Sequence, residues 1–219
     1  PGPIGGIGAS GTGIQEFTTL VHRLGSGISQ AIGTGSRDLS DEVGGISVLT
    51  ALAALESDPQ TKAIVILSKP PGQRALSELL PKIQNSPKPA VACFLGTSKS
   101  TPQENPACRV AHTLDEAAAM AVELVTGRAP ATFLEKGLDW EALVRNERSA
   151  MKAGQKYIRG IFAGGTFCYQ SQQVLQEAGV FVLSNSPLEG NRKLPDPYRS
   201  REHTLVDMGA DEFTVGRPH

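Results

Sequence analysis

The stretch Ile4-Gly5-Gly6-Ile7-Gly8-Ala9-Ser10-Gly11-Thr12-Gly13 decides the fold class. Its first six residues are apolar and rich in glycine, which predicts a short strand, and the four that follow predict a tight turn. Apolar residues then recur at helical spacing, at Ile14, Phe17, Leu20, Val21 and Leu24. The chain therefore opens with a strand, a turn and a helix.

The same alternation continues to about residue 127. Strands are predicted at 28–33, 63–67, 90–95 and 108–111, and helices at 44–55, 75–83 and 114–125. Residues 63–67 form a continuous β-branched run, which suits a strand buried on both faces. Thr113, with Glu116 three residues on, is the predicted cap of the helix at 114–125. Five strands alternating with helices predict a flavodoxin-like, doubly wound parallel sheet over residues 1–127.

The rest of the chain predicts a linker and part of a second domain. Residues 128–155 are more polar and lack a strand, although 139–152 has the pattern of a connecting helix. Residues 156–219 then predict a strand at 157–162, a helix ending at Ala178, a strand at 180–184 and a further element at 203–208. This unit is too short for a complete sheet of the first kind, so we predict the start of a second, related α/β domain.

Composition and charge disfavour several classes of partner. The chain has 219 residues, with 21 Lys and Arg against 22 Asp and Glu, so nothing favours nucleic acid or an anionic membrane surface. No apolar run approaches the ~18 residues of a membrane span, and no secretion signal is evident. Cys93, Cys108 and Cys168 are odd in number and unpaired in spacing, which argues against a disulfide framework or a zinc site. We therefore expect a cytoplasmic protein. Because the chain begins at Pro1 without an initiator methionine, we treat it as a piece of a longer protein.

Glycine is enriched, and its placement indicates an internal repeat. The 24 glycines are about 11% of the chain, against ~7% in average usage. Residues 6–12 and 160–166 match at five of seven positions, at a constant offset of 154. Two parallel βα units could use Gly-Thr independently to turn into a helix. Alternatively, the chain presents two helix N-termini of the same construction, each able to bind an anion or a phosphate.

Two common phosphate motifs fit poorly. Residues 6–11 satisfy G-x-G-x-x-G, but a dinucleotide site needs an acidic residue about 20 positions further on, and the first acid, Asp38, lies beyond that point. A P-loop needs a lysine, which Thr12-Gly13-Ile14 lacks.

These motifs resemble the ligase domain of the succinyl-CoA synthetase α subunit and its acyl-CoA synthetase relatives, and within that superfamily they are most similar to the FdrA proteins. The stretches that carry the resemblance are 8–13, 32–40, 43–45, 58–65, 68–71, 160–166, 207–211 and 213–219. Ser36 departs from the pattern, because the family usually has a third glycine there.

The resemblance implies a domain order and a phosphate carrier. It implies that this chain holds the first ligase domain and the start of the second, and lacks the region where CoA would bind. In the synthetases a histidine in a loop after the fourth strand carries the phosphate between two helix N-termini. The matching loop, 96–103, contains no histidine. His112 comes later and is expected beside a helix cap.

The FdrA resemblance further implies a subunit of an oxamate carbamoyltransferase, which converts oxalurate and phosphate to oxamate and carbamoyl phosphate in ureide (allantoin) catabolism. Phosphate would then be positioned by backbone donors. The predicted phosphate-binding residues are Ser10, Gly11, Thr12, Gly164, Gly165 and Thr166. The predicted catalytic residues are Arg37, Asp38, Arg217 and His219, with Asp207 and Asp211 as further metal or proton partners.

Two alternatives stay open. One is an NDP-forming acyl-CoA synthetase, which requires a phosphorylated protein intermediate. The other is a non-catalytic scaffold that binds phosphate or a CoA-like ligand. The expected cofactor is phosphate or an acyl phosphate, with CoA, a nucleotide and Mg²⁺ as further candidates. The expected partners are a small-molecule substrate and other transferase subunits in an oligomer.

Overall fold

A computed structural model describes residues 1–96, 107–130 and 138–217 of the chain. The first 126 residues contain one five-stranded sheet in which every neighbouring pair is parallel, in the order β2-β1-β3-β4-β5. The strands are β1 (Ile4–Gly8), β2 (Ile28–Gly33), β3 (Ala63–Ser68), β4 (Ala90–Phe94) and β5 (Cys108–Ala111). This is the flavodoxin-like order, so the predicted fold class is confirmed.

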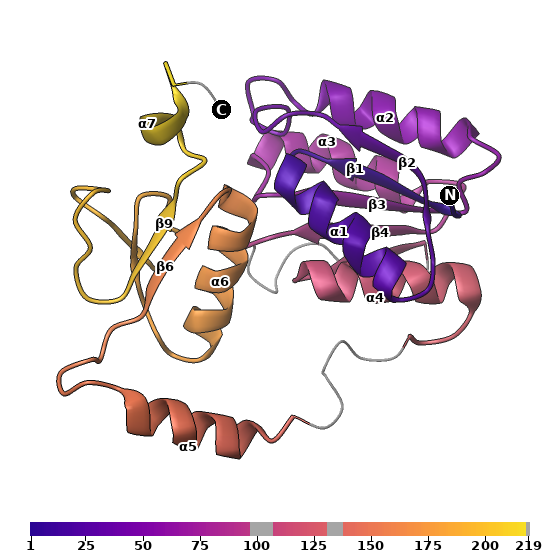
Figure 1. Cartoon of the computed structure of the whole chain (residues 1–219). Coiled ribbons are helices and arrows are strands. Elements are labelled where there is room, and N and C mark those ends of the chain that lie inside the picture. Colours follow the sequence, from indigo (N-terminus) through magenta and orange to yellow (C-terminus); the bar gives the residue numbers. More distant parts are fainter. Residues whose placement is uncertain (97–106, 131–137, 218–219) are drawn as a thin grey trace.

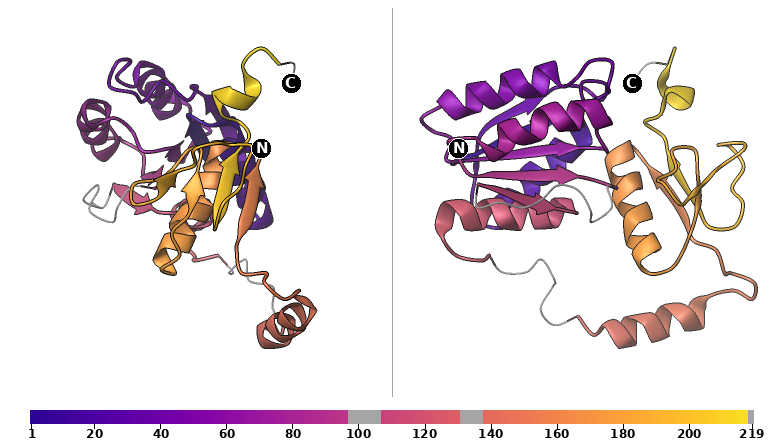
Figure 2. Two further views of the ribbon diagram at one scale, coloured as in Figure 1. Left: turned by 90° about the vertical axis from the view of Figure 1, so that its left-hand side faces the viewer. Right: turned by 180° about the vertical axis from the view of Figure 1, so that it is seen from behind.

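Helices cover both faces of this sheet (Figures 1 and 2). They are α1 (Gly11–Arg23), α2 (Ile46–Ser57), α3 (Gln73–Gln84) and α4 (Leu114–Thr126). One apolar core joins α1 and α4 to the sheet, and a second joins α2 and α3 to the opposite face. All six residues of β3 are buried, as its β-branched run predicts for a central strand.

Glycines in β1 let the helices pack closely against it. A Cβ atom on Gly5 would lie 2.8 Å from Leu55 Cδ1 and 2.9 Å from Thr61 Cγ2. A Cβ atom on Gly8 would overlap the side chain of Ile14 in α1. Part of the glycine enrichment therefore serves helix packing and not ligand binding.

The second unit is a small parallel sheet with one covering helix. Its strands run in the order β6-β9-β7-β8, all parallel. They are β6 (Arg159–Phe162), β7 (Leu183–Ser184), β8 (Arg192–Lys193) and β9 (Thr204–Asp207), with α6 (Gly165–Glu177) and α7 (Asp211–Thr214). The strands at 157–162 and 180–184 are shorter than predicted, and β8 lies between the elements expected at 180–184 and 203–208, where no strand was predicted.

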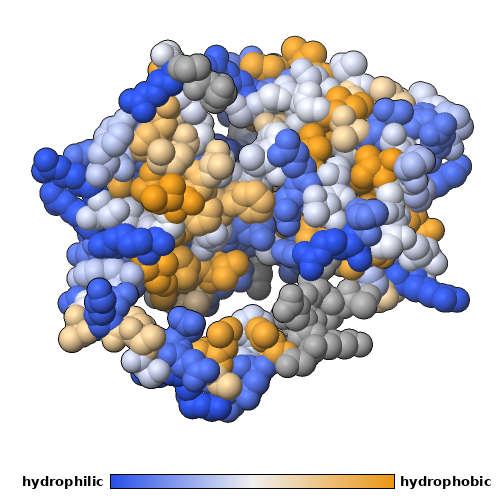
Figure 3. Space-filling model, in the orientation of Figure 1, coloured by the Kyte–Doolittle hydropathy of each residue, from blue (hydrophilic) through white to orange (hydrophobic). Residues whose placement is uncertain are grey.

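Along the chain, α5 (Trp140–Ala150) follows the first unit and precedes the second. It has no buried residue, and Asp139 caps its N-terminus. Figure 3 shows apolar side chains on its surface and on the outer side of the second unit. They include Trp140 and Val144 on α5, Ile161 on β6, and Phe181. Within the described ranges, no helix is both long enough and apolar enough to span a membrane.

Candidate functional site

The N-termini of α1 and α6 meet between the two sheets. Each helix follows the carboxyl end of a strand, β1 for α1 and β6 for α6. Ser10 Oγ lies 2.5 Å from Thr166 Oγ1, and the same Ser10 atom lies 3.2 Å from Thr12 Oγ1. Thr166 is only 2% exposed, so this contact is inside the molecule. The two halves of the sequence repeat thus touch.

A side chain larger than glycine would crowd both sides of this contact. A Cβ atom on Gly164 would lie 2.9 Å from Thr12 Oγ1, and one on Gly13 would lie 3.2 Å from Thr166 Cγ2. The structure therefore places the two predicted phosphate-binding stretches, 10–12 and 164–166, next to each other. That these residues bind phosphate stays a prediction.

The two helix starts differ from their neighbours in how they are capped. Asp38 caps α2 through the N–H groups of Ser47 and Val48, and Asp41 caps α3 through those of Arg74 and Ala75. By contrast, α1 has only the hydroxyl of Ser10, 3.4 Å from the Gly13 nitrogen, and α6 begins at Gly164, which has no side chain to offer. The first-turn N–H groups of α1 and α6 are therefore suited to an anion from outside the chain.

Lys69 adds a cation to this place, and the sequence reasoning assigned it no role. It directly follows β3, the neighbour of β1 in the sheet. A Cβ atom on Gly165 would lie 2.5 Å from Lys69 Nζ, so the ammonium group lies against the first residue of α6. The same Nζ atom lies 5.0 Å from the centroid of the Tyr169 ring. None of the ion pairs in the described part of the chain involves Lys69.

Asp207 is the acidic group beside Lys69. A Cβ atom on Gly165 would lie 2.8 Å from Asp207 Oδ2, and the Gly209 N–H donates to Asp207 Oδ1 at 2.9 Å. Asn185 fixes the backbone of Asp207 through two further hydrogen bonds of 2.8 and 2.9 Å. Asp207 is 2% exposed, so it partly offsets the ammonium charge from a rigid, buried position. Its predicted role as a metal or proton partner stays a prediction.

The side chains next to Asp207 on α6 stay uncharged at neutral pH. Burial raises the pKa of the Tyr169 hydroxyl, and the nearby Asp207 carboxylate raises it further. Burial likewise raises the pKa of the Cys168 thiol, against the opposing effect of its hydrogen bond with Ser184. Lys69 therefore supplies the positive charge here, and its ammonium group faces the neutral ring of Tyr169.

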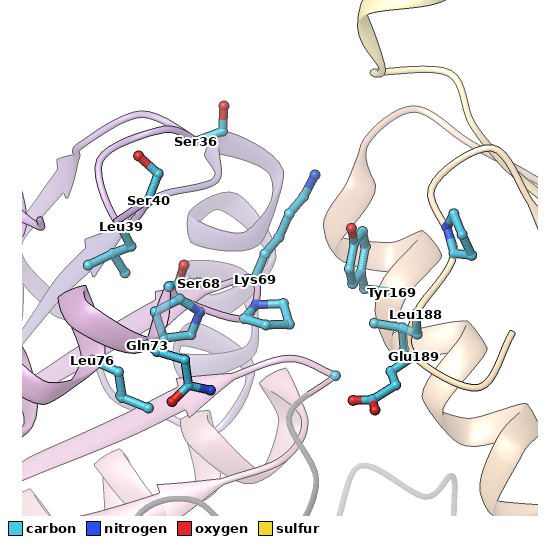
Figure 4. Close-up of a pocket in the computed structure, with 15 residues that line it drawn as sticks. Ser36, Leu39, Ser40, Ser68, Lys69, Gln73, Leu76, Tyr169, Leu188 and Glu189 are labelled. Atoms are coloured by element: carbon cyan, nitrogen blue, oxygen red, sulfur yellow. The ribbon is translucent and has the colours of Figure 1, made fainter. Parts of the chain in front are cut away.

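A cavity of about 530 Å³ opens beside Lys69, between the two units (Figure 4). Lys69 rises between the loop that carries Ser36 and Ser40 on one side and Tyr169 on the other. The cavity lies at the carboxyl ends of β3 and β4, next to the point between β1 and β3 where the strand order reverses, which is where open α/β sheets bind ligands.

The predicted catalytic residues do not converge on this place. Asp38 is 4% exposed, and both of its carboxylate oxygens accept hydrogen bonds from the N-terminus of α2 at 2.9 Å. Arg37 is exposed beside a separate open hollow that Thr34 and Ser47 also line. None of the ion pairs in the described residues joins Arg37 to Asp38.

The carboxyl-terminal candidates are similarly dispersed. Arg217 is exposed and donates to the Tyr198 hydroxyl at 3.4 Å. Asp211 is exposed at the start of α7. His219 lies outside the described residues, as does most of the loop at 96–103. His112 lies beside the cap of α4, as predicted. Its backbone N–H donates to the Glu116 carboxylate, and the Thr113 hydroxyl accepts from the Glu116 backbone N–H.

The available donors suit a phosphate group. Backbone N–H groups and one ammonium can hold a phosphate of CoA, of an acyl phosphate or of the free ion. Among the described residues, no three His, Cys, Asp or Glu side chains are grouped to hold a metal ion.

Comparisons with known proteins agree with a CoA-ligase-like scaffold. Residues 1–96 match the model of the CoA binding domain. Over its whole length the chain is 40% identical to the uncharacterized protein YahF of Escherichia coli (strain K12), of which it covers 42%. Over 96 residues it is 32% identical to the α subunit of malate–CoA ligase of Methylorubrum extorquens, of which it covers 31%. The chain thus spans less than half the length of the curated relatives it matches.

These similarities support a relationship to the succinyl-CoA synthetase-like superfamily and an acyl-CoA synthetase-like scaffold. They also correct one expectation. The region where CoA would bind was expected outside this chain, yet the CoA binding domain model matches residues 1–96. The narrower FdrA assignment stays a prediction.

Proposed function

We propose that this chain is a subunit of an oxamate carbamoyltransferase-like enzyme, in which the N-termini of α1 and α6 hold the phosphate. The observation that carries the proposal is the meeting of the two helix starts, where Ser10 Oγ lies 2.5 Å from Thr166 Oγ1. Each helix end carries about half a positive charge, so two of them with the Lys69 ammonium outweigh the single carboxylate of Asp207.

The proposed reaction needs positioning and charge stabilisation. An oxygen of hydrogen phosphate attacks the ureido carbonyl carbon of oxalurate, and the bond from that carbon to the internal nitrogen breaks. The new C–O bond gives carbamoyl phosphate, and the proton of hydrogen phosphate passes to the leaving nitrogen, which becomes the amide of oxamate. No residue of the chain forms a covalent bond, so the helix N-termini would act by orienting phosphate and by stabilising the oxyanion.

The test combines turnover with binding. The full-length protein, purified with its partner subunits, is expected to form carbamoyl phosphate from oxalurate and phosphate. In the Thr12→Val and Thr166→Val double variant, we expect the KM for phosphate to rise about tenfold or more, because two hydroxyls at the helix starts are lost. Thr19→Val is the matched control, since Thr19 is exposed on α1 and bonds only to Gln15. Absence of turnover with intact subunits would refute the assignment.

An NDP-forming acyl-CoA ligase is the second candidate, favoured by the match of residues 1–96 to the CoA binding domain. Like the malate–CoA ligase chain it resembles, the protein would then work with another subunit. This activity requires a phosphorylated protein, so radioactive ATP should label the complex. Unlabelled protein that still turns over oxalurate would exclude it.

A further inference from the structure

The cavity beside Lys69 has the lining of a binding site for a small polar anion. Three serine hydroxyls and one carboxamide reach it from two segments of the chain, 36–40 and 68–73. These are Ser36, Ser40, Ser68 and Gln73. Among the described residues that line it, Lys69 is the one with a positive charge, and Glu189 at the rim is the one with a negative charge. Its volume of about 530 Å³ is within the usual range for small-molecule pockets.

The position of the Lys69 ammonium is electrostatically unusual. It lies against Gly165, the first residue of α6, where the helix dipole already concentrates positive charge. The Tyr169 ring faces it at 5.0 Å, and Asp207 Oδ2 lies on the same side of Gly165, but no carboxylate of the described chain forms an ion pair with it. A second anion, approaching from the cavity, would offset this charge.

We propose that the cavity binds the organic co-substrate, a small acid with a carboxylate next to an amide or ureido group, and that Lys69 pairs with its carboxylate. This inference rests on the proposed function. Lys69 lies between the cavity and the start of α6, so a carboxylate on its ammonium keeps the rest of the molecule in the cavity. The serine hydroxyls and the Gln73 carboxamide then hydrogen-bond the amide groups of the same molecule.

Isothermal titration calorimetry of the 219-residue chain, in the presence of phosphate, measures binding of a small acid and of its neutral counterpart. The probes are oxamate, which carries the carboxylate, and oxamide, its neutral counterpart. Oxamate is expected to bind and oxamide to bind at least about tenfold more weakly. Lys69→Met keeps the apolar stem and should weaken oxamate binding about tenfold, whereas Lys69→Arg should stay within about threefold.

A variant of opposite charge guards against a general loss of folding. Glu189 is exposed at the rim, so Glu189→Gln should leave the fold intact and strengthen oxamate binding about twofold by removing a like charge. Equal binding of oxamate and oxamide, or equal effects of Lys69→Met and Glu189→Gln, would overturn the inference.

The two proposals can fail separately. If phosphate binds and depends on Thr12 and Thr166 but oxamate does not bind, the cavity assignment is wrong and the proposed function stands. If neither phosphate nor oxamate binds, the proposed function itself is wrong. Binding of CoA that is insensitive to Lys69→Met, without binding of oxamate, would assign the cavity to a neutral pantetheine arm and refute the carboxylate site.

Discussion

Replacing Asp38 with alanine should destabilise the protein and leave phosphate binding unchanged. Its carboxylate accepts hydrogen bonds from the Ser47 and Val48 N–H groups, both at 2.9 Å, and the residue is 4% exposed. The helix it caps begins at Gly45, which has a φ of 78° and offers no side-chain cap of its own. Asp38 therefore closes the loop onto α2 from seven residues before the cap position.

The expected magnitude follows from these two bonds. A hydrogen bond to a charged group contributes about 1.5–3 kcal/mol, and loss of a helix cap costs about 0.5–2 kcal/mol. Because the two bonds share one carboxylate and water can reach the exposed Ser47 N–H after truncation, we expect Asp38→Ala to cost about 3 kcal/mol. Asp38→Asn keeps one acceptor oxygen and should cost about half as much.

Urea denaturation followed by circular dichroism measures this loss. With a slope of about 2 kcal/mol/M, the unfolding midpoint of Asp38→Ala should fall by about 1.5 M. Asp41→Ala is the matched control. Asp41 caps α3 through one oxygen and is exposed, so its loss should cost only about 1 kcal/mol. A change below about 0.5 kcal/mol in Asp38→Ala, or a loss of phosphate binding in a fully stable variant, would refute the capping role and favour the catalytic one.

Three further predictions concern the reactivity of the thiols, the loss of stability at low pH and the packing of the glycines. The three cysteines are buried, and burial raises the pKa of Cys93 to about 12, so no thiol should react with a disulfide reagent at pH 8 until urea is added. Prompt release of one equivalent would contradict the packing. The Thr61 hydroxyl lowers the pKa of Asp58 below its usual 3.8, so this carboxylate contributes stability above that value and loses it as pH falls through the lowered pKa. Asp58→Asn should therefore lose stability at pH 7 but differ little from the parent in strong acid, and a constant difference across that range would count against it. Gly5→Ala places a Cβ atom 2.8 Å from Leu55 Cδ1 and should lower the unfolding free energy by about 1–3 kcal/mol, whereas Gly33→Ala, with open space, should not. Equal stability of the two glycine variants would exclude the close packing of β1.

The order of the first sheet could be anticipated because its signals are local. The β-branched run of β3 and the punctuated helices specify alternating elements, and short connections then leave few topologies for a parallel sheet. The second unit was harder to predict. Its strands β7 and β8 have two residues each, too few to show any period, and β8 is made of exposed Arg192 and Lys193. They are strands only through their pairing, of β7 with β9 and of β8 with β7.

The candidate site divides in the same way. The shared turn sequence predicts two similar helix starts, and the family resemblance implied that they lie around one phosphate; the contact between Ser10 and Thr166 agrees with that arrangement. Lys69 could not be assigned, because its significance depends on β3 lying beside β1 although α1, β2 and α2 separate them along the chain. The catalytic roles of Arg37 and Asp38 stay predictions, since their spacing along one loop gives no indication that Asp38 folds back onto α2.

Capping distinguishes the starts of α1 and α6 from those of α2, α3 and α4. Asp38 caps α2, Asp41 caps α3, and Thr113 caps α4 by accepting from the Glu116 N–H. A carboxylate at Ser10 or Gly164 would bind the same N–H groups and would repel a phosphate from them. Ser10 and Gly164 instead leave the first N–H groups of α1 weakly capped and those of α6 uncapped, where the two helix N-termini meet. Ser10→Asp should therefore stabilise α1 in isolation, as an acidic cap does, and abolish phosphate binding; retained phosphate affinity in a folded Ser10→Asp variant would show that the anion lies elsewhere.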